Sequence, residues 1–546
     1  MKTGLTLLSA TLICATVNAL ELQPTFRDGN YKHVVFSASI GGSSHHNWAL
    51  SILDEVGQRG HRASYLTTTK ETRFGRPYST IETVDIGAAV NYENDTMIAD
   101  LCDGKSIADT LPQMITVLAT NYERDYAILL DYFKHNKVDL ALCDHFMEVC
   151  IDAATTLNIP FIRTSSFEMT SESSASYVNN RIDSLQYPTT EFEPFYSRFR
   201  SKFISPWTLL YKMYPAVTEI VARKRALGIN AKFEPPEETW KNSIMLINNV
   251  FGYMPARRIG SMAEHVGPII PKSYAPLTAD LESYLSLHSN VVYAGFGQNA
   301  IPPKKDVLFV LTTLLEGLEQ GYIDGFIWSI FNSAKLFPEK VTTSSGTTYA
   351  VHDILNNRNP NILMMSWVPQ TAILLHPSTS VFISHGGLGS WYESIYAGKP
   401  MLMLPFFGDQ PGNSFTIEHE GLGFILNRKA DPAQVSRLFI EVTDKEGEII
   451  KNVKRMQAMT QIHSEHGIMR GADVVEEVLY THKGGILPHR VPASTRMSFM
   501  KANNIDLYLA LVLGIVATSS LVAAGVYKSY QRFSQHTKMQ TKLKNL

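Results

Sequence analysis

Short apolar segments alternate with segments of helical periodicity in two separate parts of the chain. In the first part, an apolar run at 33–39 is followed by a glycine-rich turn, a helical pattern over 48–56 and a second apolar run at 63–66. The same alternation returns over 291–404. A strand–helix–strand order makes neighbouring strands parallel and covers the sheet with helices. The sequence therefore predicts an α/β protein of two doubly wound lobes, with a ligand cleft at the carboxyl ends of the strands.

The length and composition fit two packed lobes. At 546 residues the chain is too long for one ordinary core. Its content of 45% hydrophobic and 18% charged residues excludes a disordered, collagenous or coiled-coil protein. A net charge of -2 excludes the basic surface of a general nucleic-acid binder. We expect an N-terminal lobe over 20–260 and a C-terminal lobe over 261–490, with a Pro/Gly-punctuated linker at 252–276.

The N-terminus has the order of a secretory signal peptide. A lysine precedes an apolar stretch from Leu5 to Val17, and small residues then indicate cleavage near Ala19. We expect residues 1–19 to be removed, and an N-terminal membrane anchor is the alternative. An odd number of cysteines would then remain, which argues against a designed set of disulfides. These cysteines are Cys102, Cys143 and Cys150.

A second apolar segment, Leu507 to Tyr527, contains 21 residues without a charge. As a helix it would span about 31 Å, close to the hydrocarbon thickness of a bilayer. A buried core helix is the alternative. Residues 528–546 carry only basic charges, which is typical of a cytosolic tail. Together with the signal peptide, this predicts a single-pass type I membrane protein whose body lies in the lumen, in contact with membrane lipid.

Two short motifs bear on the location of the chain. Lys542 and Lys544 stand fifth and third from the C-terminus and resemble the dilysine retrieval signal of endoplasmic-reticulum membrane proteins. Asn94 begins the one N-glycosylation sequon. We therefore expect the endoplasmic reticulum or another endomembrane.

Aromatic residues gather between Phe192 and Tyr214. They could form an exposed amphipathic surface, a wall of the substrate site, a membrane-facing patch or one side of an ordinary core helix. The sequence leaves these four interpretations open.

The densest pattern of polar and glycine residues lies between Trp367 and Gln410. A predicted strand ends at His385, a glycine-rich turn follows, and a helix is expected to begin at Ser390. Free backbone N–H groups and the helix dipole at such a turn form an anion site suited to phosphate. His385 could donate to a phosphate oxygen, and Trp367 offers a flat face on which a base can stack.

Polar side chains could complete this site. Glu393 could accept from ribose hydroxyls, while Asp409 and Gln410 could bind hydroxyls of a sugar. Simpler roles exist for each residue, since Ser390 and Glu393 have the spacing of a helix capping box and a lone histidine or tryptophan is usually a core residue. The combination of all of them within one short segment favours the binding site.

This segment resembles the signature of the UDP-glycosyltransferase family, which includes the UDP-glucuronosyltransferases and plant glycosyltransferases. The resemblance extends over nearly the whole chain, because the layout of two lobes, membrane span and basic tail is similar to that of the animal members. It implies a two-lobed GT-B fold, inverting transfer of a sugar from a UDP-sugar, no metal and no other cofactor. It assigns donor binding to Gly297, Gln298, Trp367, Gln370, His385, Gly387, Gly389, Ser390, Glu393, Asp409 and Gln410.

The family's catalytic base is a histidine in the first glycine-rich loop. Counting back from the helix at 52–56 places this role on His45, with His46 beside it. Asp144, at the end of a predicted strand, matches the family's partner aspartate, and a helix cap near Met147 is the alternative. Histidine is the side chain best suited to remove a hydroxyl proton near neutral pH, and a carboxylate partner would fix its tautomer.

Three positions depart from the family pattern. Gln298 stands where a Ser or Thr is common, and Gly389 stands where animal members tend to have Asn; both would contact the phosphates. Asn248 stands where the glucuronosyl members carry an arginine for the glucuronate carboxylate, with Arg257 and Arg258 several residues later. This departure favours a neutral sugar such as glucose.

We therefore expect an inverting glycosyltransferase that moves a hexose, preferably glucose, from a UDP-sugar to a hydroxyl of a small apolar acceptor such as a lipid, sterol, phenol or xenobiotic. A UDP-glucuronosyltransferase is the first alternative. A non-catalytic, membrane-anchored binding protein on the same fold is the second, and the intact His45, Asp144, His385 and Gln410 argue against it. The sequence carries no motif that identifies the acceptor, and it leaves homo-oligomer formation open.

Overall fold

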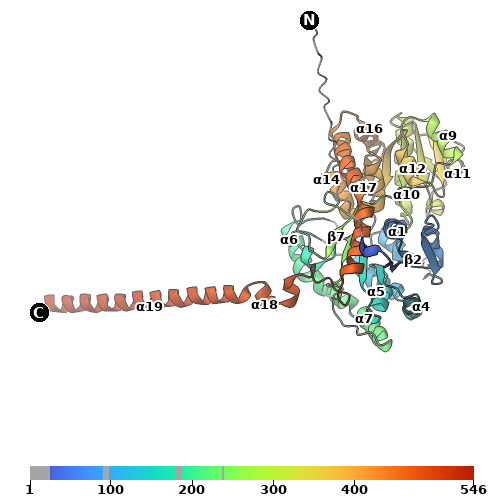
Figure 1. The fold of residues 1–546 in the computed structure, drawn as a ribbon. Helices are drawn as coiled ribbons and strands as arrows, with labels where there is room; N and C mark the ends of the chain where they lie inside the picture. Colours follow the sequence, from blue (N-terminus) through green and yellow to red (C-terminus); the bar gives the residue numbers. More distant parts are fainter. Residues whose placement is uncertain (1–24, 90–96, 180–186, 236–238, 332, 546) are drawn as a thin grey trace, which may run out of the picture.

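The computed structural model describes residues 25–89, 97–179, 187–235, 239–331 and 333–545. The predicted signal peptide and the sequon at Asn94 lie outside the described residues. The body consists of two parallel β-sheets with helices packed around each, and one long helix projects from it (Figure 1). The predicted α/β architecture of two doubly wound lobes is confirmed.

The first lobe contains a sheet of seven parallel strands in the order β3-β2-β1-β4-β5-β6-β7. The strands are β1 (His33–Ser37), β2 (Arg62–Thr67), β3 (Ile81–Asp85), β4 (Leu140–Asp144), β5 (Phe161–Ser165), β6 (Met245–Ile247) and β7 (Ala263–His265). The helices are α1 (Ser43–Gln58), α2 (Met97–Cys102), α3 (Ile107–Leu118), α4 (Tyr122–His135), α5 (Glu148–Thr156), α6 (Phe195–Phe199) and α7 (Ser205–Ala226). Strands β1 and β4 are buried along their whole length because helices cover both faces of the sheet.

The second lobe contains six parallel strands in the order β12-β9-β8-β13-β14-β15. These are β8 (Val291–Gly295), β9 (Gly325–Ser329), β12 (Ile362–Met365), β13 (Thr379–Ser384), β14 (Met401–Met403) and β15 (Gly423–Ile425), and a short antiparallel hairpin adds β10 (Lys340–Thr342) and β11 (Thr348–Ala350). The helices are α9 (Ala279–Leu287), α10 (Lys304–Glu319), α11 (Val351–Leu355), α12 (Gln370–Leu375), α13 (Leu388–Tyr396), α14 (Gln410–His419), α15 (Pro432–Val435) and α16 (Leu438–Thr443).

Helix α17 (Glu448–Thr481) joins the two lobes. Its first half packs in the core of the second lobe through Val453 and Met456, whereas its second half packs in the core of the first lobe. The first sheet also extends past residue 261, because β7 lies inside the segment at 252–276 that was expected to be a linker. A single boundary in the sequence therefore does not divide the chain into the two lobes, because segments after residue 261 also belong to the first lobe.

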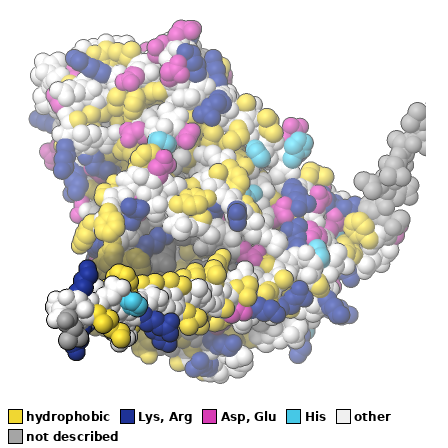
Figure 2. Space-filling model, turned by 90° about the vertical axis from the view of Figure 1, so that its left-hand side faces the viewer, with side chains coloured by type: hydrophobic (Ala, Val, Ile, Leu, Met, Phe, Trp, Pro, Cys, Tyr) yellow, Lys and Arg dark blue, Asp and Glu magenta, His cyan; other side chains and the backbone are white. Residues whose placement is uncertain are grey.

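The C-terminal helix α19 (Ile505–Lys544) follows the short α18 (Phe499–Ala502). Among the described residues it is the one helix long and apolar enough to cross a membrane, and none of it is buried against the body. Figure 2 looks at the side from which it projects and shows hydrophobic side chains along the helix, with Lys and Arg toward its tip. A buried core helix, the alternative for this segment, is excluded.

The cysteines differ from the expectation. Cys143 and Cys150 form a disulfide whose Cα atoms are 5.7 Å apart, while Cys102 is free and buried. The expectation against a disulfide was wrong, because an odd number of cysteines leaves one thiol over without preventing the others from pairing. Here the end of β4 and the start of α5 bring the two sulfurs together.

Candidate active site

His45 lies in the first turn of α1, directly after a turn of two glycines. Gly41 and Gly42 have φ angles of 97° and 67°, in the region that favours glycine. A Cβ atom on Gly41 would lie 2.2 Å from Cδ2 of His45, far inside a van der Waals contact. The backbone therefore needs glycine at this position to leave room for the imidazole.

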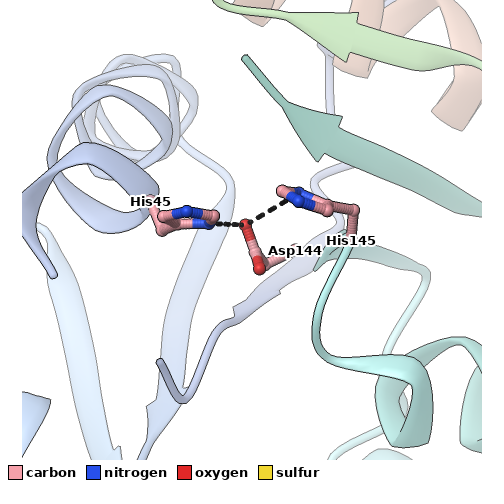
Figure 3. A group of neighbouring side chains, drawn as sticks. All are labelled: His45, Asp144 and His145. Atoms are coloured by element: carbon pink, nitrogen blue, oxygen red, sulfur yellow. Dashed lines mark hydrogen bonds and ion pairs between the residues drawn. The ribbon is translucent and has the colours of Figure 1, made fainter. Parts of the chain in front are cut away.

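Asp144 ends β4, which pairs with β1 in the sheet. Because adjacent parallel strands end at the same edge, the residues that follow β1 come close to the end of β4. Nδ1 of His45 lies 2.9 Å from Oδ2 of Asp144, a distance at which the ring N–H donates to the carboxylate (Figure 3). The other carboxylate oxygen accepts the backbone N–H of Phe146 at 3.0 Å. Asp144 thus holds the histidine by Nδ1 and leaves Nε2 for a substrate.

His45 and Asp144 each shift the pKa of the other. Burial lowers the pKa of His45, but the charge of Asp144 and the hydrogen bond outweigh it, so that this pKa lies above its usual value. Burial raises the pKa of Asp144, but the nearby histidines and its hydrogen bonds hold that pKa below its usual value. Asp144 is therefore a carboxylate at neutral pH, as a partner for a protonated imidazole must be.

His46 has a different environment from His45. It is fully buried, its Nδ1 lies 2.6 Å from the hydroxyl of Tyr65, and its ring stacks on Phe74 with centroids 4.8 Å apart. Burial lowers the pKa of His46 to about 3. His46 is therefore a core residue.

His145 is a neighbour of the pair that the sequence analysis did not single out. Its Nδ1 lies 3.7 Å from Oδ2 of Asp144, on the side opposite His45 (Figure 3). Burial lowers the pKa of His145 to about 4, so it is neutral near pH 7. Its place directly after Asp144 was the only signal in the sequence. Within the described residues, these three side chains are the group whose donor atoms, all within 4.8 Å of one another, could hold a metal ion.

In the second lobe, His385 lies between two glycines. A Cβ on Gly297, whose φ is 71°, would lie 2.8 Å from Cε1 of His385, and a Cβ on Gly387 would lie 2.6 Å from its Nε2. Burial lowers the pKa of His385 to about 4, so the ring is neutral and can donate only one hydrogen bond. Both glycine positions therefore shape a slot for this ring.

Helix α13 begins beside His385. Its first residue is Leu388, two residues before the expected start at Ser390, and Gly387 precedes it without a side-chain cap. Ser390 therefore lies inside the helix, which excludes the capping-box interpretation. The backbone N–H groups of the first turn have no partner within the helix, as an anion site at a helix N-terminus requires.

Side chains around α13 form a polar network. Gln370 donates to Ser390 Oγ at 3.2 Å and to the carboxylate of Glu393, and its own amide oxygen accepts from Tyr293 at 3.1 Å. Thr371 donates to the other carboxylate oxygen of Glu393 at 2.6 Å. Glu393, expected to accept from ribose, thus has both oxygens engaged by protein groups.

The remaining donor-site candidates flank this network. Oδ2 of Asp409 accepts from Asn413 at 2.6 Å, and the side-chain oxygen of Gln410 accepts the backbone N–H of Phe406 at 2.9 Å. Burial raises the pKa of Asp409. Trp367 is 54% exposed, unlike a core tryptophan, so that its ring is available for stacking.

The two lobes meet at these loops. A Cβ on Gly42 would lie 3.1 Å from the side-chain oxygen of Gln298, and a Cβ on Gly389 would lie 3.7 Å from the Cβ of Ser44. The charge of Asp409 also contributes to the raised pKa of His45. The histidine–aspartate pair of one lobe and the glycine-rich loops of the other therefore share one junction.

Comparison with known proteins agrees with this arrangement. The sequence model of the family described as "UDP-glucoronosyl and UDP-glucosyl transferase" matches residues 42–539. The chain belongs to this family. A UDP-glycosyltransferase of Talaromyces amestolkiae is 28% identical over 390 residues, which cover 68% of this chain and 73% of the relative. UDP-glucuronosyltransferase 3A1 of Mus musculus is 25% identical over 300 residues, which cover 54% and 53% of the two chains.

Solved structures identify the fold. A UDP-glucose:anthocyanidin 3-O-glucosyltransferase in complex with UDP superposes with a TM-score of 0.57 at 18% identity, covering 82% of this chain and 99% of that one. This protein is thus a UDP-glycosyltransferase with the GT-B fold, and the predicted family, fold and enzyme class are confirmed. The alternative of a non-catalytic binding protein is set aside.

Proposed function

We propose that this UDP-glycosyltransferase transfers glucose from UDP-glucose to a hydroxyl group of a small apolar acceptor, with inversion at the anomeric carbon. The observation that carries this proposal is the 2.9 Å hydrogen bond between His45 and Asp144 at the junction with the donor-binding loops. Nε2 of His45 removes the proton of the acceptor hydroxyl, and Asp144 stabilises the resulting imidazolium. The acceptor oxygen bonds to the anomeric carbon as the bond to the UDP oxygen breaks on the opposite face.

The second lobe would hold the leaving UDP. The free N–H groups at the start of α13 and the ring of His385 face the diphosphate, whose negative charge grows as the glycosidic bond breaks. The exposed face of Trp367 stacks on the uracil, and Asp409 with Gln410 binds hydroxyls of the sugar. Glu393 acts mainly by fixing Gln370, since its oxygens already accept from protein side chains.

The preference for a neutral sugar rests on Asn248. This residue is buried, and its side-chain oxygen accepts the backbone N–H of Ile269 at 2.7 Å. It therefore braces the backbone where a glucuronate-binding member would present a cation. Of the later arginines, Arg257 is partly buried, and this burial lowers its pKa although the charge of Glu168 acts in the opposite direction.

We expect the reaction to need no metal, because the helix N-terminus and His385 supply the groups that stabilise the diphosphate. Turnover should survive prolonged dialysis against EDTA. A loss of turnover that Mg²⁺ or Mn²⁺ restores would contradict this part of the proposal.

We place the catalytic body in the lumen of the endoplasmic reticulum. The apolar α19, the basic residues after it, the N-terminal signal sequence and the terminal lysines Lys542 and Lys544 support this location. Modification of Asn94 would be consistent with it.

The decisive experiment is a donor panel. The full chain in detergent is incubated with UDP-glucose, UDP-glucuronate, UDP-galactose or UDP-N-acetylglucosamine and a mixture of phenols, sterols and lipids, and UDP release is measured. UDP-glucose should support the highest kcat/KM, and the product should have the β configuration. A higher kcat/KM with UDP-glucuronate would overturn the assignment of the sugar.

A further inference from the structure

One long helical segment of the first lobe exposes an unusual number of aromatic side chains. Helix α6, a π-helical turn at Arg200–Ile204 and α7 run on without a break from residue 195 to residue 226. We call its exposed aromatic residues the aromatic face. They are Phe195, Tyr196, Phe199, Phe203, Trp207, Tyr211 and Tyr214.

The aromatic face does not belong to the core. Trp207 is 72% exposed and Tyr211 is 83% exposed, which excludes the interpretation of this segment as an ordinary core helix. Five of its members recur at intervals of four residues, so that each lies next to the following one on the helix surface and the set covers about half of its circumference. Helix α7 packs on α3, and its second half buries Ala216 and Val221. The segment is therefore fixed to the body through α7, while the aromatic side chains ahead of this buried part stay exposed.

The charged side chains within the segment of the aromatic face are basic, and one of them, Lys212, is paired with Asp109 of the neighbouring helix α3. From residue 194 to residue 218, the charged residues are Arg198, Arg200, Lys202 and Lys212, without an aspartate or glutamate. The acidic residue just before this segment, Glu193, is buried and accepts from Ser197 at 2.7 Å. Aromatic rings interspersed with cations match the interfacial zone of a bilayer, where Trp and Tyr lie at the level of the headgroups and cations meet phosphates.

The membrane anchor leaves the body near this face. In the segment before the anchor, the hydroxyl of Ser494 donates to Glu172 at 3.4 Å, and Glu172 lies in the part of the chain that leads toward α6. Leu507 comes thirteen positions after Ser494, and even a fully extended chain of this length would reach no further than about 45 Å. Figure 1 places α6 on the side of the body from which α18 and α19 project.

We propose that the aromatic face docks on the same bilayer that α19 crosses and rests in its headgroup region. The first lobe would then be held against the membrane at two points, by the anchor and by the helix α6–α7. The bilayer is favoured over a second copy of the chain because the anchor already fixes it within reach of the face. The cations Arg198, Arg200 and Lys202 also suit phosphate headgroups and would repel an identical surface.

The protein contains a natural reporter for this contact. Of its six tryptophans, four are buried: Trp48, Trp240, Trp328 and Trp391. Trp367 lies in the donor site, and the apolar segment from Leu507 to Tyr527 contains no tryptophan. Trp207 is thus the one tryptophan on the aromatic face.

The test uses the full chain reconstituted in bilayers of phosphatidylcholine and phosphatidylserine whose acyl chains carry bromine near the carbonyl group. Bromine quenches tryptophan only at short range, so these lipids should lower the emission of the parent chain, and Trp207→Phe should lose most of that decrease. Trp367→Phe is the matched control and should retain it. UDP binding by Trp207→Phe verifies that the variant is folded.

Two outcomes would overturn the proposal. Equal quenching of the parent chain and Trp207→Phe would mean that Trp207 does not face lipid. An emission of Trp207 that responds to protein concentration in detergent, and not to brominated lipid, would assign the face to contacts between copies. Neither outcome depends on the identity of the sugar or the acceptor, so this test of membrane docking is independent of the proposed reaction.

Discussion

His45 and His46 are neighbours in the sequence, yet the first turn of α1 gives them separate environments. Successive residues of a helix point about 100° apart, so one ring reaches Asp144 and the other enters the core beside Tyr65. The family motif predicted the pairing of His45 with Asp144, and the fold explains it, because Asp144 ends β4 and His45 follows β1, whose end lies at the same edge of the sheet. It could not predict the contact of His145 with Asp144, since the conformation of the loop after β4 decides it.

The two histidines should respond differently to substitution. His45→Ala should lower turnover by about 10²–10⁴-fold, the usual contribution of a general base, with little change in UDP affinity. His46→Ala should instead lower the melting temperature, because it removes a buried ring and its hydrogen bond to Tyr65. Steady-state kinetics, UDP calorimetry and thermal unfolding separate the two effects. If His46→Ala folded but lost turnover while His45→Ala stayed active, the catalytic base would be His46 and not His45.

The pH dependence should follow the protonation of His45. A base must be neutral to accept a proton, so kcat/KM should fall as pH drops through the raised pKa of His45. Asp144→Asn removes the charge that raises this pKa and leaves the burial that lowers it. The acid limb of the profile should therefore move to lower pH while kcat decreases. An acid limb at the same pH in both proteins would assign it to another group.

At the scale of elements, local sequence patterns predicted β13, the glycine turn and α13 correctly. The start of α13 was placed two residues late, at Ser390 after the whole glycine-rich turn, whereas the helix already begins at Leu388 and includes Gly389. The slot for His385 could not be predicted, because its second wall, Gly297, comes from the loop after β8. The sequence thus predicted individual strands and helices, but it did not predict the contacts that side chains of different elements make with one another.

This slot gives a matched pair of substitutions. Gly387 has φ -66° and ψ 139°, which any residue can adopt, but a Cβ there would lie 2.6 Å from His385. Gly387→Ala should displace the ring and weaken UDP binding by about 1–3 kcal/mol. Gly389→Ala, two residues away, would place its Cβ at an ordinary 3.7 Å from Ser44 and should bind UDP nearly as the parent does. Calorimetry with UDP checks both, and similar affinities for the two variants would refute the slot.

At the scale of the whole molecule, α17 shows what the sequence could not reveal. Helical periodicity indicates that one side of α17 is buried, but not that its two halves pack on different lobes. The close packing of the second half of α17 on the first lobe depends on two glycines. A Cβ on Gly467 would lie 2.0 Å from the carbonyl oxygen of Val266, and one on Gly471 would lie 2.4 Å from Ile52. The long apolar helix, by contrast, was predictable, because its length and lack of charge are local properties.

The orientation of the whole molecule in the membrane can be tested with terminal tags. If residues 1–19 act as the predicted signal sequence, they would bring the body across first, α19 would stop the transfer, and the basic residues from Lys528 onward would stay in the cytosol. Protease added to sealed microsomes should therefore remove a tag at the C-terminus and spare one placed just after the signal cleavage site. Detergent should expose both tags, which is the control for sealed vesicles. A body digested in sealed vesicles together with a protected C-terminal tag would reverse the topology and place His45 and Asp144 in the cytosol.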